Sequence, residues 1–266
     1  MPIFSLIQRD LRMRIYYGRA QCFIQMALFL LITVFFVIAF ELNHLSQDAE
    51  WISVGRFWDG FSEMDLESFK QSGTFHIPYL WLFFQLLYFL SLRTFFLIDL
   101  TSNSGMIILR TGVKKFVAGK AISLFLYTWL YVSVLMVFII FVSTIQFFIY
   151  HVHLSWVSHW LVSITFYIFL IISLFLEALI FEFISIFLGE VIGFLSLFSF
   201  NFLSIFSKNI LLVGNYTMFS RWSESTRFRD NILFVQAWLI VLMIAVLVME
   251  IIALSKMDLI NEKGEK

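Results

Sequence analysis

The sequence is short of cysteine and of charge. Its 266 residues include one cysteine, and only 14% of them are charged. A single cysteine excludes an internal disulfide framework and a metal site built from several cysteines. The 18 lysines and arginines are few and lie beside apolar segments, so we expect no nucleic-acid partner.

Motifs that carry enzymatic chemistry are also absent. We find no serine-nucleophile motif, no HExxH pair and no paired-carboxylate protease motif. The stretch RTGVKKFVAGKAI (110–122) comes close to a phosphate-binding loop, which reads GxxxxGK[ST]. Lys114 stands in place of its first glycine, and Ala121 replaces the hydroxyl residue that holds magnesium. We therefore expect no enzyme activity, no nucleotide and no other cofactor on this chain.

Three histidines lie close together in a short predicted loop. His151 and His153 have the HxH spacing of some metal ligands, and His159 follows them. No acidic residue or cysteine stands beside them to complete a ligand set. We therefore interpret them as polar loop residues and predict no metal site.

Apolar residues, in contrast, are abundant. They make up 61% of the chain, and the mean hydropathy is +0.92, which no ordinary soluble domain reaches. Several runs reach about 20 residues, the length of a membrane-spanning helix. The sequence predicts an all-α polytopic membrane protein with a single domain over residues 1–266. Its six expected spans are 22–40, 77–98, 121–141, 156–178, 188–206 and 231–253.

Lysine and arginine placement predicts the orientation. Basic residues precede the first span and follow the second, at Arg9, Arg12, Arg14, Arg19, Arg110, Lys114, Lys115 and Lys120. The loop between these spans is acidic and is expected outside, so six spans place both termini in the cytoplasm. The basic segment Lys208, Arg221, Arg227 and Arg229 falls on the predicted outer side and contradicts this pattern. A re-entrant hairpin around residues 189–215 is the alternative for this region.

The first 20 residues predict an amphipathic leader. Ile3, Ile7, Leu11 and Ile15 recur every four residues, and arginines occupy other faces of the same helix. Such a helix can lie on the inner leaflet with its arginines at anionic lipid. A solvated basic leader is the alternative. The segment lacks the pattern of a cleavable signal peptide, and we expect none.

Five charged residues lie in or near the expected spans. They are Arg93, Asp99, Glu177, Glu182 and Glu190. Charges at such depths are costly unless they are paired or hydrated. They could form a polar cargo route or a coupling network, or else a structural ion pair or groups that snorkel to the interface. We place all five near the cytoplasmic ends of their spans, which favours the structural interpretation.

The segment GEVIG at the start of the expected fifth span contains a GxxxG pair. Gly189 and Gly193 would share one helical face and let another backbone approach closely. The approaching helix can belong to a second subunit, which would make this a dimer interface, or to the same subunit.

The loop at 100–120 predicts a short helix. Ser102, Asn103 and Ser104 are good N-cap residues, and Gly112 is a suitable C-terminal stop. The helix would expose an apolar surface that a free loop would not carry. Either a partner groove covers it or it rests on the inner leaflet. The expected partner-binding residues are Met106, Ile107, Ile108, Arg110, Lys114 and Lys115.

This layout resembles the type 2 ATP-binding-cassette permeases. The basic leader, the six spans and the segment IDLTSNSGMIILRTGVKKFVAGKAI are similar to that family, and its basic positions match at Arg110, Lys114, Lys115 and Lys120. The resemblance implies that the loop docks on a separate ATPase, which carries ATP and magnesium. It also implies a second permease subunit, either a copy of this chain or a related one.

The resemblance further implies a function and a cellular location. It predicts a permease in a bacterial cell membrane that exports a peptide or a bacteriocin-like cargo, or protects its own cell against one. An ion-coupled secondary transporter that uses Arg93, Glu177 and Glu182 is the first alternative. A membrane scaffold without transport activity is the second.

Overall fold

The computed structural model of the chain describes residues 3–43, 58, 60–73, 77–101, 108, 111–150, 160–224 and 231–256. These residues form helices and connecting turns, without a strand among them, which confirms the all-α prediction for this part of the chain. The elements are α1 (Ile3–Asn43), α3 (Glu63–Ser72), α4 (Tyr79–Thr101), α6 (Val113–Tyr150), α8 (Trp160–Leu188), α9 (Glu190–Phe206), the 3₁₀ helix η1 (Val213–Thr217), α10 (Phe219–Glu224) and α12 (Ile232–Lys256).

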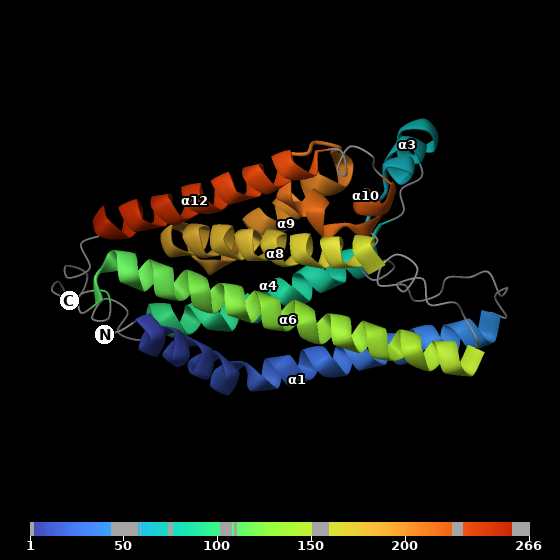
Figure 1. Cartoon of the computed structure of the whole chain (residues 1–266), viewed down its shortest axis with the longest axis horizontal. Helices are drawn as coiled ribbons and strands as arrows, with labels where there is room; N and C mark the ends of the chain where they lie inside the picture. Colours follow the sequence, from blue (N-terminus) through green and yellow to red (C-terminus); the bar gives the residue numbers. More distant parts are fainter. Residues whose placement is uncertain are drawn as a thin grey trace.

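The long helices α1, α4, α6, α8, α9 and α12 lie side by side and run in alternating directions along one axis (Figure 1). The first residue of α1 and the last residue of α12 lie at the same end of this bundle, which we call the terminal end. The short helices α3 and α10 lie toward the opposite end, which we call the α3 end.

Three helical stretches within the described residues are long and apolar enough to cross a membrane. They are Val113–Phe138, Ile164–Leu188 and Ile232–Lys256. Two shorter apolar helices, Tyr79–Leu92 and Glu190–Phe206, accompany them. The structure therefore supports a helical membrane protein with three candidate spans, and the other three spans stay predictions.

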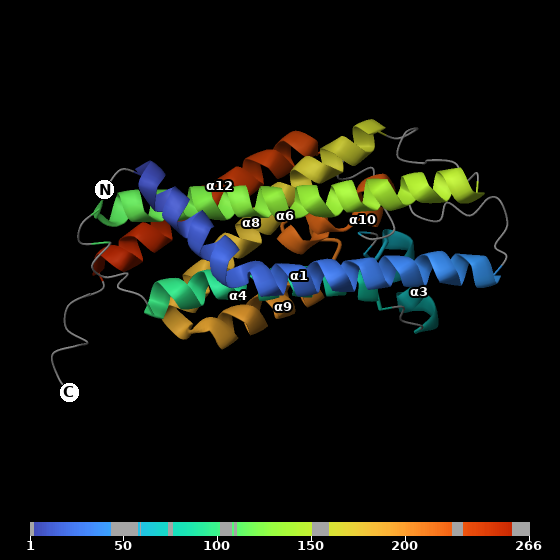
Figure 2. The same cartoon turned by 90° about the horizontal axis from the view of Figure 1, so that it is seen from below.

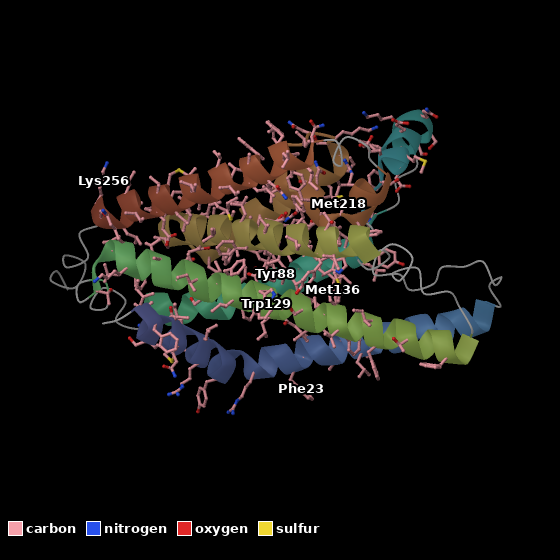
Figure 3. The ribbon with its side chains drawn as sticks, viewed as in Figure 1. Phe23, Tyr88, Trp129, Met136, Met218 and Lys256 are labelled. Carbon is pink, nitrogen blue, oxygen red and sulfur yellow. The ribbon has the colours of Figure 1, made fainter. Side chains whose placement is uncertain are left out.

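Helix α8 lies at the centre of the bundle and packs against α6, α9, η1 and α12. Tyr88 of α4 joins three helices, because its hydroxyl lies 2.7 Å from Thr128 Oγ1 of α6 and donates to Leu174 O of α8 (Figure 3). Helix α12 shows the opposite pattern, with Leu233, Ile240 and Ile244 among its exposed side chains. Apolar surface of this extent is expected where lipid, rather than water, covers a helix.

Helix α1 is a single helix of 41 residues that changes direction in its N-terminal third (Figure 2). The predicted leader is therefore the bent first arm of α1. Its protein-facing side holds Leu6 and Asp10, which are buried, while Ile3 and Phe4 are exposed. Leu6 fits here because Gly119 of α6 lacks a side chain, and a Cβ on Gly119 would lie 2.8 Å from Leu6 Cδ2. The apolar pattern predicted from Ile3, Ile7 and Leu11 thus lies on a side of α1 that is only partly covered by the rest of the protein.

Lys208, one of the basic residues that contradicted the predicted orientation, is paired with acids of α3. Its Nζ lies 2.7 Å from Glu67 Oε1 and 3.3 Å from Glu63 Oε2. The hydrogen bond to Glu67 is the main cause of the raised pKa of Lys208. One residue of the basic segment thus pairs with two acids of the first loop at the α3 end.

Arg221 is buried at the same end. Its guanidinium donates to the carbonyl oxygens of Phe61, Ser204, Ile205 and Ser207 at 2.7–3.5 Å. Three of these carbonyls belong to the last turn of α9 or follow it, where a helix leaves its carbonyls without partners. Burial lowers the pKa of Arg221, but arginine stays protonated. Arg227 and Arg229 lie outside the described residues.

Candidate functional site

The segment that joins α4 to α6 lies at the terminal end. Of the expected partner-binding residues, the structure describes Ile108, Lys114 and Lys115, whereas Met106, Ile107 and Arg110 lie outside the described residues. Gly112 has φ +79°, a left-handed conformation that glycine adopts without strain, and its N–H donates to Ile108 O at 2.7 Å. The chain therefore makes the predicted stop at Gly112 and starts α6 directly after it.

Ile108 is a buried anchor. It belongs to a separate apolar cluster with Leu6 of α1, Phe116 and Val117 of α6, and Leu254 of α12. We call these five residues the terminal-end cluster. The contact that the structure shows for Ile108 is thus internal, and its contact with a partner stays a prediction. Lys114 and Lys115 differ, because both side chains are exposed.

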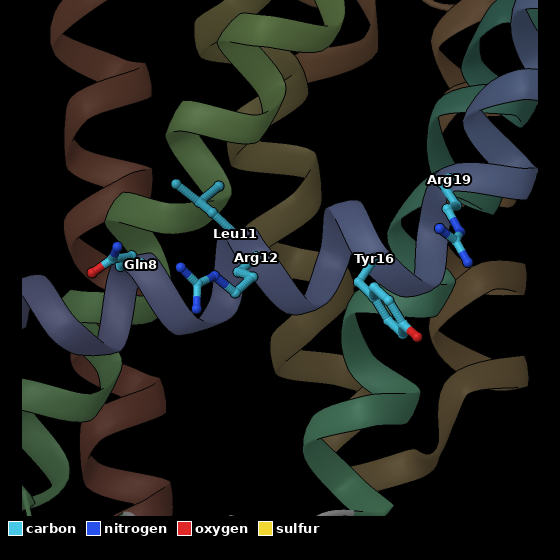
Figure 4. Close-up of a pocket in the computed structure, with 5 residues that line it drawn as sticks. All are labelled: Gln8, Leu11, Arg12, Tyr16 and Arg19. Atoms are coloured by element: carbon cyan, nitrogen blue, oxygen red, sulfur yellow. The ribbon is translucent and has the colours of Figure 1, made fainter.

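A cavity of about 480 Å³ opens along the first arm of α1 (Figure 4). It is lined by Gln8, Leu11, Arg12, Tyr16 and Arg19. The Arg19 guanidinium lies 5.0 Å from the centre of the Tyr16 ring. Two positive charges without a carboxylate in the lining suit an anionic group such as a lipid phosphate.

A buried ion pair crosses from α6 to α8 near the terminal end. Lys120 Nζ lies 2.6 Å from Glu182 Oε1, and both side chains are almost fully buried. Glu250 of α12 is 1% exposed and interacts electrostatically with both. Glu250 lies within the predicted sixth span, and the sequence analysis missed it. It could have been found, because it is the one acidic residue of the apolar helix α12.

Glu177 lies farther from the end of its helix than the sequence indicated. The predicted fourth span ended at Ala178, but α8 continues to Leu188. Glu177 therefore lies about 16 Å along the helix from Leu188, close to the middle of the candidate span Ile164–Leu188. The predicted end of the span came too early, because no residue breaks the helix before Gly189, and the position of both glutamates relative to the membrane stays a prediction.

Glu177 faces Asn201 of α9. Its carboxyl is fully buried, and Asn201 Nδ2 donates to Glu177 Oε2 at 3.4 Å. Glu177 Oε1 and Asn201 Oδ1 are buried and have no hydrogen-bond partner among the residues that the structure describes. Asn201 was missed in the sequence, although a lone amide inside an apolar run is a recognisable signal.

Helices α8 and α9 form a tight hairpin about Gly189. Gly189 has φ +88°, and a side chain there would meet open space. Gly193 is buried against α8 of its own chain, where a Cβ would overlap Ser185 Oγ. The contact shown for Gly193 is internal, and the predicted dimer interface stays a prediction. Glu190 lies half-buried in the first turn of α9, where helix N-termini favour acids.

For several other predicted positions the structure describes no side chain. Arg93 and Asp99 lie in the described helix α4, but their side chains are outside the described part. His151, His153 and His159 also lie outside it. The part of the chain that the structure describes has no group of three or more histidine, cysteine or acidic residues that could hold a metal.

Comparisons of the chain with protein-family models, with curated proteins and with solved structures give no match. Its function is therefore argued from the residues and contacts of the chain itself.

Proposed function

We propose that this chain is the membrane-spanning subunit of an ATP-driven exporter whose ATPase is a separate protein. The observation that best supports the proposal is the position of Ile108 in the terminal-end cluster. Through this residue the segment between α4 and α6 joins a cluster to which the first arm of α1, the start of α6 and the end of α12 also contribute. A displacement of the segment would therefore be passed to three helices at once.

The exposed lysines supply the docking surface. Lys114 and Lys115 follow Gly112 on the first turn of α6, at the end of the bundle where the terminal-end cluster lies. Two adjacent positive charges favour a partner with an acidic surface, and they steer its approach. The ATPase would bind there, hydrolyse ATP with its own magnesium, and move the segment, so that the bundle opens a cargo path.

The proposal includes six spans with both termini in the cytoplasm. The alternating directions of the six long helices support it (Figure 1). The charge distribution supports the same orientation, because Lys114, Lys115 and Lys256 lie at the terminal end and the acids of α3 lie at the other. The pairing of Lys208 with Glu63 and Glu67 reduces the unpaired positive charge that the basic segment brings to the proposed outer side.

The orientation predicts opposite labelling of two single cysteines in a Cys22→Ser background. Ser68→Cys lies on the exposed side of α3, and Ser255→Cys lies on the exposed side of the last turn of α12. An impermeant thiol reagent should label position 68 in intact cells and position 255 only after permeabilisation. The background without a new cysteine is the control, and labelling in the reverse order would invert the topology.

The proposed cargo rests on the resemblance to type 2 ATP-binding-cassette permeases and not on a contact in the structure. We propose a peptide or bacteriocin-like cargo, or self-protection against such a peptide, in a bacterial cell membrane. A second permease subunit, identical or related, would complete the path, and Gly189 and Gly193 remain candidates for its contact. Membrane lipids would cover the exposed apolar faces of α6 and α12.

Charge reversal at the exposed lysines should uncouple the ATPase. We expect the double variant Lys114→Glu, Lys115→Glu to weaken binding of the ATPase about tenfold or more at low salt, because attraction becomes repulsion. Binding should be measured by retention of ATP-hydrolysing protein on the tagged, purified chain, and export should be measured in parallel. The wild-type interaction should itself weaken at high salt.

Lys256→Glu is the matched control, because it reverses an exposed charge at the same end of the bundle. It should leave the ATPase bound. Normal retention and normal export in the double variant would rule out docking at Lys114 and Lys115. A wild-type chain purified from its own membranes without any ATP-hydrolysing partner would contradict the proposed function as a whole.

An ion-coupled secondary transporter is the second candidate. The specific observation that favours it is the buried group Lys120, Glu182 and Glu250, which brings charge into the bundle between three helices. Transport by the reconstituted chain that follows an imposed proton or sodium gradient, without ATP or a partner, would favour this function over the first.

A further inference from the structure

Glu177 is buried as deeply as any residue of the bundle. None of its surface is exposed, and within the described residues its carboxyl has one hydrogen bond, from Asn201 Nδ2 at a long 3.4 Å. Its second carboxyl oxygen has no partner among the described residues. A carboxylate is a strong acceptor, so an ionised Glu177 would lack most of the hydrogen bonds that it would make in water.

No described positive charge compensates for this burial. Helix α9 and η1, which pack on this part of α8, contain no lysine or arginine. Lys120 of α6 is already paired with Glu182, farther along α8. Arg221 of α10, a helix that packs against α8 and η1, donates instead to backbone carbonyls at the α3 end. The side chain of Arg93 of α4 is outside the described part of the structure. An unpaired buried carboxylate is so costly that the group normally becomes neutral.

A neutral carboxylic acid fits the surroundings of Glu177. Its O–H needs an acceptor, and Asn201 Oδ1 is a buried acceptor to which no described residue donates. Asn201 is 1% exposed, and its Nδ2 donates toward Glu177 Oε2 and Leu197 O. An acid and an amide that face each other can exchange two hydrogen bonds. One proton would therefore satisfy both oxygens that are left without partners.

A metal cation fits less well than a proton. Hard cations need several oxygen ligands, and Glu177 and Asn201 together supply two unpartnered ones, Glu177 Oε1 and Asn201 Oδ1. Gly214 of η1 closes the site, since a Cβ there would lie 2.6 Å from Asn201 Oδ1 and from Ser204 Oγ. The Ser204 hydroxyl already donates to Phe200 O. Gly214 thus packs closely against Asn201 Oδ1, and a proton, unlike a further ligand, adds almost no volume there.

We propose that Glu177 and Asn201 form a proton-binding site in the middle of the bundle. Glu177 holds the proton while α8, α9 and η1 are packed together. When these elements separate and water reaches the carboxyl, the proton is released to that water and Glu177 ionises. Opening of the α8–α9 hairpin is thereby linked to loss of one proton, with or without a partner ATPase.

Infrared difference spectroscopy of the full chain in lipid nanodiscs tests the site directly. At neutral pH the wild-type chain should show the C=O stretch of a protonated carboxylic acid. Glu177→Gln should abolish that band, and Glu190→Gln, which alters a half-buried glutamate outside the site, should retain it. Glu177→Gln should also fold normally, because glutamine has the shape of the neutral acid and can donate to Asn201 Oδ1.

Asn201→Leu gives a second readout on the native glutamate. The acid band should persist but move to higher frequency, because the O–H loses its acceptor. Four results would overturn the proposal: no acid band in the wild type, loss of the band in Glu250→Gln but not in Glu177→Gln, failure of Glu177→Gln to fold, or no shift in Asn201→Leu. A band that disappears on addition of sodium at constant pH would show a cation site instead.

Discussion

Replacement of Arg221 with leucine is expected to lower the free energy of unfolding by about 3–5 kcal/mol, the range for breaking a buried charged interaction. The guanidinium is completely buried and donates to four backbone carbonyls. Leucine fills part of the volume but donates nothing, so the carbonyls of Phe61, Ser204, Ile205 and Ser207 lose this donor. Arg221→Lys should recover only part of the loss, because an ammonium cannot reproduce the planar fork.

Thermal and denaturant unfolding of the purified chain in one detergent would measure this effect. Lys208→Leu is the matched control, since it removes a positive charge at the same end whose ion pairs lie nearer to solvent. It should change stability much less. Equal stability of Arg221→Leu and the wild type would show that Arg221 does not hold the α3 end together.

Replacement of Lys120 with methionine should have an effect of similar size, again about 3–5 kcal/mol. The lysine lies 2.6 Å from Glu182 and also interacts with Glu250. Its removal leaves two acidic groups buried between α6, α8 and α12 without their cation. Methionine keeps most of the apolar stem of the lysine, so the loss would come from charge rather than from volume.

A double-mutant cycle with Glu182→Leu separates the interaction energy of Lys120 and Glu182 from the effect of each residue alone. The double variant Lys120→Met, Glu182→Leu should be more stable than the sum of the single effects implies, because apolar side chains replace both ions of the pair. Unfolding measurements on the four proteins give the coupling energy. Additive losses would mean that Lys120 and Glu182 act independently, and that their closeness contributes no stability.

Apolar runs carried most of the information about the fold. They predicted helices, and each of the six predicted spans overlaps a long helix in the described part of the chain. The predicted span boundaries differ from the helix boundaries, as in α8, which continues past Ala178 because no helix breaker stands before Gly189. A run longer than the membrane is thick does not tell where the membrane ends, so the depth of Glu177 and Glu182 could not be predicted from hydropathy.

Side-chain partners were less predictable than helices. The sequence analysis singled out Glu177 and Lys120. It could not predict that Glu177 contacts Asn201 or that Lys120 contacts Glu182, because these contacts depend on how α6, α8 and α9 face each other. Arg221 was even less accessible to sequence reasoning. A buried arginine on backbone carbonyls leaves no acidic partner to find, so its charge was interpreted only as a conflict with the topology.

The two ends of α9 have different consequences for the order of folding. At its start, Gly189 turns the chain so tightly that Gly193 meets Ser185, a few residues earlier in the sequence. Such local contacts can form as soon as both helices have been synthesised, and they require little loop closure. At its other end, Arg221 must reach Phe61, 160 residues earlier. The α3 end therefore cannot close until α10 has emerged from the ribosome, and the α8–α9 hairpin must wait for it in the membrane.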